Sequence, residues 1–234
     1  MRDSTVPKMA GTSHHVVQRR NDGSPCFFTD EDYLVYLDCL KDAAERNRCA
    51  VHAYVLMPDH VQLLVSLDKE RRLARMMRCV NGRYVEYVNY VYQRNGAFWE
   101  HGPKSTLIDS EQDLLASYCS VETTPVRACL AASPADYRWS SHSHHANGSE
   151  DTLIRDHPWY LDLGATQRER QFACHELFRQ TVDDRMPAEI RHSANPGSML
   201  SDNRLKDRIE RLVREVRWAG SGRPRTTEHA FAVA

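Results

Sequence analysis

The chain has 234 residues and a formal net charge of -1, with 41% hydrophobic and 27% charged residues. This length suffices for one compact domain with an extension or for two small domains, and the composition excludes a chain that is disordered throughout. Because the net charge is close to zero, any nucleic-acid-binding surface has to be local. The seven cysteines are scattered and include no C-x-x-C pair, which argues against a disulfide framework or a zinc knuckle.

No segment reads as a targeting signal or a membrane span. The N-terminus, MRDSTVPKMAGTSHH, lacks the apolar core of a secretory signal, and no apolar run approaches the length needed to cross a bilayer. We therefore expect a cytoplasmic protein with reduced cysteines and no membrane partner.

The first two predicted elements are a strand and a helix. His14–Gln18 (HHVVQ) is a short β-prone run that ends in a polar stretch. Thr29 then offers an N-cap with Asp32 three residues later, and apolar residues follow at helical spacing. This pattern predicts an amphipathic helix over about residues 30–47.

Two further strands are expected at Cys49–Met57 and Val61–Leu67, joined by a turn at Pro58-Asp59. A second helix follows, because apolar residues recur at intervals of one, three and four between Leu73 and Val91. Its other face carries much of a local basic cluster: residues 69–104 hold eight basic and three acidic side chains.

A fourth strand is expected at Lys104–Asp109, and Ser110 with Asp113 caps a third helix that runs toward Pro125. The resulting order is β-α-β-β-α-β-α. This order predicts an α+β protein of the ferredoxin-like, split βαβ type, with an antiparallel sheet and helices packed on one face, followed by a helical C-terminal extension.

The regular spacing of apolar residues that indicates strands and helices becomes weak after about residue 138. Ser140–Asp151 (SSHSHHANGSED) reads as a polar loop, and its histidines, His142, His144 and His145, are better explained by a solvated loop than by a metal site. We divide the chain into a main domain (1–141), a polar loop and weakly helical extension (142–200), and an amphipathic helix with a basic flexible tail (201–234).

The hairpin YVLMPDHVQLLVS carries the first candidate chemistry. His60 and Gln62 are two residues apart in a strand, so both side chains project from one face and can reach one divalent ion. A glutamine oxygen is uncharged and binds weakly, which suits Mg²⁺ or Mn²⁺ better than zinc. For an isolated H-x-Q pair, a solvated strand face is the commoner explanation.

The surrounding sequence resembles the HUH-type single-tyrosine transposases, specifically the IS200-like branch that includes the REP-associated tyrosine transposases. HAYVLMPDHVQLLV is close to the pattern HAYxLMPNHxHLLV of that family. The resemblance covers about residues 15–141. It continues, in the same order, through NGRYVEYVN, FWE, KSTLIDSE, PVRA and DYRWSS.

The resemblance implies a DNA strand transferase. In such proteins a tyrosine on the third helix attacks a phosphate of single-stranded DNA, forms a 5′-phosphotyrosine and leaves a free 3′-hydroxyl. A divalent metal held by the two histidines polarises the phosphate. The implied partner is hairpin or single-stranded DNA, and a homodimer remains open because both dimers and monomers occur in the family.

The residues that would carry the reaction depart from the family pattern. Aligning PVRA on the family motif places Ser120 at the tyrosine and Thr124 at a metal-facing asparagine, and Gln62 replaces the second histidine. Only His60 is retained. We therefore expect impaired cleavage and a Mg²⁺ or Mn²⁺ ion that is weakly bound or lost.

Two alternatives are open at the reaction centre. Tyr118 could replace the missing nucleophile, with Glu122 as a new ligand, but two residues correspond to a rotation of about 200° on a helix, so the helix would have to turn. A Tyr118 that simply packs in the core needs no such adjustment.

The remaining expectations concern DNA. Arg75, Arg78, Arg83 and Lys104 are the candidate phosphate contacts. The alternative function is a catalytically silent, domesticated DNA- or RNA-binding protein that uses the sheet or the basic helix.

Overall fold

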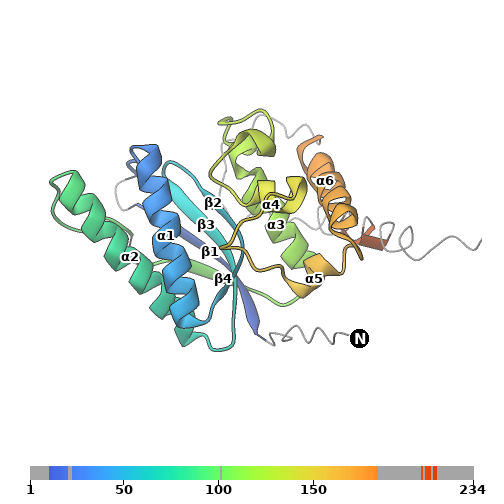
Figure 1. Cartoon of the computed structure of the whole chain (residues 1–234), viewed down its shortest axis with the longest axis horizontal. Coiled ribbons are helices and arrows are strands. Elements are labelled where there is room, and N and C mark those ends of the chain that lie inside the picture. Colours follow the sequence, from blue (N-terminus) through green and yellow to red (C-terminus); the bar gives the residue numbers. More distant parts are fainter. Residues whose placement is uncertain are drawn as a thin grey trace, which may run out of the picture.

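The computed structural model describes residues 11–20, 23–100 and 102–183, together with 207, 209–211 and 213–214. Its centre is a four-stranded antiparallel sheet in the order β2-β3-β1-β4 (Figure 1). The strands are β1 (Thr12–Arg19), β2 (Ala50–Leu56), β3 (His60–Leu67) and β4 (Lys104–Ile108). This strand order, with a helix between β1 and β2 and between β3 and β4, confirms the predicted split βαβ fold.

One face of the sheet is covered by α1 (Asp30–Asn47) and α2 (Arg71–Val91), as expected (Figure 1). The predicted N-cap of α1 is present as a capping box between Thr29 and Asp32. The apolar stripes of both helices pack on alternate residues of the strands, such as Leu63 of β3, and form the first buried cluster.

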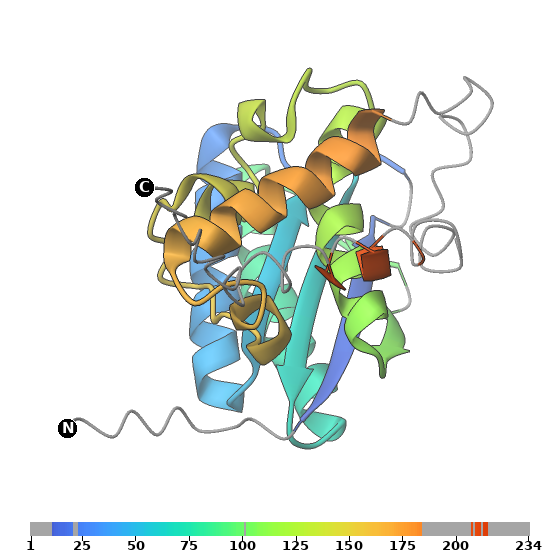
Figure 2. The same cartoon turned by 90° about the vertical axis from the view of Figure 1, so that its right-hand side faces the viewer.

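The opposite face is covered as well, so β2 and β3 are buried along their whole length, whereas most of the edge strand β4 is exposed. Figures 1 and 2 show α3 lying along this face with three later helices around it. Val55 of β2 and Leu64 of β3 join these helices in a second buried cluster. The helices are α3 (Glu111–Arg127), α4 (His142–Asn147), α5 (Pro158–Leu161) and α6 (Gln167–Asp183), and a short 3-10 turn, η1 (Pro134–Asp136), follows α3.

The loop prediction for Ser140–Asp151 was wrong over His142–Asn147, which forms α4. His142 and His145 are buried rather than solvated, because both face a buried carboxylate on α3, that of Glu122. The sequence pattern did not indicate α4 because its polar side chains have their partner, Glu122, on α3, far away in the chain.

The C-terminal helix expected after Ser201 is described only in part. Residues 207, 209–211 and 213–214 are helical, and Ile209 and Val213 are buried in the second cluster. The expected basic tail lies outside the described residues. Within the described part of the chain, no helix has the length and apolar character of a membrane span.

Candidate functional site between the sheet and helix α3

The four residues expected at the reaction centre lie together. His60 and Gln62 project from the face of β3 that α3 covers, and Ser120 and Thr124 lie one turn apart on α3. The Gln62 amide nitrogen lies 3.0 Å from Nε2 of His60 and donates to Oγ1 of Thr124 at 3.2 Å. The alternation of the strand and the period of the helix therefore place these residues as the sequence indicates.

A second histidine, which the sequence did not single out for this site, joins from the neighbouring strand. Nε2 of His15 donates to Oε1 of Gln62 at 3.0 Å. In the register of β1 with β3, His15 lies opposite Leu64, so it shares the face of Gln62. Burial lowers the pKa of His15 to about 4, so the ring is neutral at pH 7.

Arg127 closes the site at the end of α3. Its guanidinium donates to the backbone oxygen of Ser120 at 2.7 Å and to Oγ1 of Thr124 at 2.9 Å. Burial lowers the pKa of Arg127 only to about 10, so the side chain is charged at pH 7. Arg127 belongs to the PVRA motif, but only the fold shows that its charge lies beside Thr124.

The hydrogen bonds in this site form a closed network. Gln62 uses both amide hydrogens, one toward His60 and one toward Thr124. The Thr124 hydroxyl in turn donates to the backbone oxygen of Ser120 at 2.7 Å. His60 accepts through Nε2, so its proton lies on Nδ1, which donates to Oδ1 of Asp59 at 2.7 Å. This hydrogen bond from His60 lowers the pKa of Asp59.

Members of this kind of transposase generally use a divalent metal ion, but the donor set of this chain does not fit one. Nε2 of His60 accepts one amide hydrogen of Gln62, and Nε2 of His15 donates to the Gln62 oxygen, so neither of these nitrogens has a lone pair free for a metal. The Thr124 hydroxyl is held between Gln62, Arg127 and a backbone oxygen. The set contains no carboxylate, and the Arg127 charge beside Thr124 opposes a dication. The network takes the place that an ion would need.

The two candidate nucleophiles lie on different sides of α3. Ser120 is fully buried, and its hydroxyl lies 3.5 Å from the Arg127 guanidinium. Tyr118 belongs to the second buried cluster, where its ring lies 4.9 Å from the ring of His145. Burial raises the pKa of Tyr118 well above its usual value. The helix is therefore not turned in the way that a Tyr118 nucleophile beside His60 would require.

The predicted DNA contacts lie on the opposite side of the sheet or at its edge. Arg75, Arg78 and Arg83 are exposed on α2, and Lys104 is exposed at the start of β4. Arg83 makes an ion pair of 2.7 Å with Asp42 of α1. Arg78 instead lines a cleft of about 900 Å³ between α2 and residues 97–105, whose walls also include His14, Phe98, Trp99 and Ser105.

Comparison with known proteins identifies one family. The model described as "Transposase IS200 like" matches residues 8–119, from before β1 to within α3, and the match ends one residue before Ser120. No curated protein matches the chain.

Two solved structures are similar at low sequence identity. A REP-associated tyrosine transposase bound to a REP hairpin is 15% identical, with a TM-score of 0.47 over 62% of this chain and 91% of that one. A protein of Deinococcus radiodurans R1 classed as a transposase is 16% identical, with a TM-score of 0.37 over 47% of this chain and 88% of that one. The family model covers just under half of the chain, the part that contains the sheet and most of α3, and over this part the chain is similar to the IS200-like transposases.

Proposed function

We propose that this chain binds hairpin or single-stranded DNA and that its strand-cleaving chemistry is impaired. The observation that carries the proposal is the closed hydrogen-bond network at the reaction centre. Ser120 stands at the position of the nucleophilic tyrosine and is fully buried, and Gln62 and Thr124 bind each other where the family would hold a metal ion. A buried serine hydroxyl with no base beside it is a poor nucleophile.

The basic surface supports a retained affinity for DNA. Arg75 and Arg78 are exposed on α2, and no ion pair of either is found in the described part of the chain. Lys104 is exposed at the edge of the sheet beside the cleft that Arg78 lines. Such side chains can follow a phosphate backbone, and their contribution to binding falls as the salt concentration rises. The Arg83 side chain contributes less, because Asp42 already neutralises it.

The proposal is tested with labelled hairpin-containing single-stranded DNA and Mn²⁺, followed by a denaturing gel that detects a covalent adduct. We expect no adduct with the natural chain. A triple variant, Gln62→His with Ser120→Tyr and Thr124→Asn, returns the family residues to all three positions. It should form an adduct, because the sheet and α3 still present these positions to one another.

Matched variants separate the possible outcomes. A triple variant with Ser120→Phe in place of Ser120→Tyr has the ring but no hydroxyl, and it should form no adduct. An adduct with the natural chain that Tyr118→Phe abolishes would overturn the proposal of impaired cleavage. If the triple variant binds DNA with a steep salt dependence but never forms an adduct, the alternative of a catalytically silent DNA- or RNA-binding protein is favoured.

A further inference from the structure

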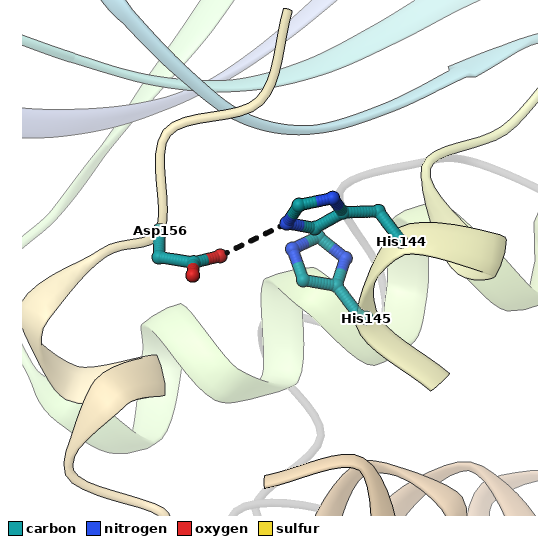
Figure 3. A group of neighbouring side chains, drawn as sticks. All are labelled: His144, His145 and Asp156. Atoms are coloured by element: carbon teal, nitrogen blue, oxygen red, sulfur yellow. Dashed lines mark hydrogen bonds and ion pairs between the residues drawn. The ribbon is translucent and has the colours of Figure 1, made fainter. Parts of the chain in front are cut away.

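A second group of polar side chains lies on the other side of α3, where α4 and the segment before α5 meet. His144, His145 and Asp156 each offer one ligand atom to a common centre, and these atoms all lie within 4.8 Å of one another (Figure 3). Nε2 of His144 lies 3.2 Å from Oδ1 of Asp156. Neither the nucleophile position nor the DNA-contacting arginines belong to this group.

His145 gives this group the features of a binding site. The residue is fully buried, and its Nδ1 lies 2.6 Å from Oε1 of Glu122, which is itself fully buried on α3. The other ring nitrogen, Nε2, has no hydrogen-bond partner among the described residues. A buried polar atom without a partner is costly. A carboxylate on one nitrogen of an imidazole is the arrangement that orients metal-binding histidines through their other nitrogen.

We propose that His144, His145 and Asp156 bind one zinc-class divalent ion, with water completing a tetrahedral shell. Two imidazole nitrogens and one carboxylate oxygen are a donor set that zinc accepts. With ligand bonds of about 2.0–2.1 Å, tetrahedral geometry brings the ligand atoms to about 3.3 Å from one another, so the group has to close by roughly 1.5 Å at most.

The ion has a route to this site, and its binding has one identifiable cost. The side chains of His144 and Asp156 are 20% and 30% exposed, so they open the site to solvent, whereas His145 forms its buried wall. The backbone N–H of Asp151 donates to Nδ1 of His144 at 3.3 Å. Coordination of the ion through Nε2 of His144 requires the ring proton to lie on Nδ1. Nδ1 can then no longer accept from the N–H of Asp151, so this long hydrogen bond is lost.

The proposed ion would join three elements of the fold. It would tie α4 to the segment before α5 and, through Glu122, to α3, the helix that carries Ser120. The chain between the two ligand positions turns at Gly148, which caps α4 with a φ of 72°, a conformation that favours glycine. This inference does not rest on the proposed function, because it uses none of the residues of the reaction centre.

The test measures zinc binding by titration calorimetry and by metal content after gel filtration, on the full chain carrying His60→Gln so that β3 cannot contribute. We expect one zinc per chain and a rise in the unfolding temperature on adding zinc. His144→Gln and Asp156→Asn should each weaken binding by about 100-fold or more. His175→Gln is the matched control, since His175 is exposed on α6 and outside the group, and it should leave the affinity unchanged.

Two results would overturn the proposal. One is a chain that binds no zinc, and the other is zinc affinity that neither ligand variant reduces. Should a variant fail to fold, the visible spectrum of the Co²⁺-loaded chain decides. Tetrahedral nitrogen and oxygen ligation gives strong visible absorption without a thiolate charge-transfer band. A weak octahedral spectrum, or a thiolate band from the cysteines, would refute the assignment.

Discussion

Replacing Gln62 by leucine should destabilise the fold because it breaks the network between the sheet and α3. Gln62 is 1% exposed and makes hydrogen bonds to His15, His60 and Thr124. Gln62→Leu leaves the Nε2–H of His15 without an acceptor and the Nε2 of His60 without a donor. Thr124 keeps its bond from Arg127 at 2.9 Å.

The expected loss follows from these two orphaned groups. Each buried polar group left without a partner costs about 1–3 kcal/mol. The additional apolar surface that leucine buries offsets roughly 1–2 kcal/mol of this cost. We therefore expect Gln62→Leu to lower the free energy of unfolding by about 1–4 kcal/mol, measured by urea denaturation followed by circular dichroism at pH 7.

Gln18 provides a matched control for this experiment. It is also 1% exposed and lies on β1, but neither polar atom of its amide has a hydrogen-bond partner among the described residues. Gln18→Leu should therefore be neutral or stabilise the fold by about 1 kcal/mol, because it removes a buried amide that is not satisfied. Equal losses for the two variants would refute the reasoning, since the network would then contribute nothing.

Three other perturbations test different parts of the structure. Burial lowers the pKa of His52 from 6.5 to about 3. Because the folded-state pKa lies below the unfolded value, its contribution to stability is present above pH 6.5 and is lost as the pH falls, by about 2 kcal/mol between pH 7 and pH 5. His52→Asn should remove this loss in urea titrations at the two pH values, and the exposed His175→Asn should not. Arg78→Ala should weaken binding of hairpin DNA and lower the slope of log K against log salt by about 1 in fluorescence anisotropy. Arg83→Ala should change this slope less, because Arg83 is already paired with Asp42. Equal changes of the slope for Arg78→Ala and Arg83→Ala would count against DNA binding in the cleft that Arg78 lines. Tyr118→Ala should cost about 3–5 kcal/mol of unfolding free energy. Tyr118→Phe should leave stability and DNA binding nearly unchanged, and a large effect of that variant would contradict a packing role.

Local signals predicted most of the fold. The helix expected over residues 30–47 is observed as Asp30–Asn47, and the Ser110 hydroxyl accepts from the backbone N–H of Asp113 as the capping pattern indicates. The alternation around Pro58 placed His60 and Gln62 on one face of a strand. These features depend on residues close together in the chain, and a single sequence carries that information.

The parts that could not be predicted depend on contacts between distant residues. His15 reaches Gln62 only through the register of β1 with β3, which neither strand specifies alone. Glu122 is a polar residue within a helix. Nothing near it in the chain indicates that His142 and His145, some twenty residues later, will pack against its carboxylate. The packing of α4, α5 and α6 was missed for the same reason, because these helices contact α3 and one another rather than residues near them in the chain.

The interlocked bonds of Gln62, Thr124 and Arg127 have an evolutionary consequence. Each of these side chains satisfies a polar group on the next, so restoring a single family residue would break bonds without assembling a working centre. Under the proposed loss of cleavage, a route back to activity would pass through one or two less stable and still inactive proteins. Selection that acts on one substitution at a time would then work against restoring the family residues.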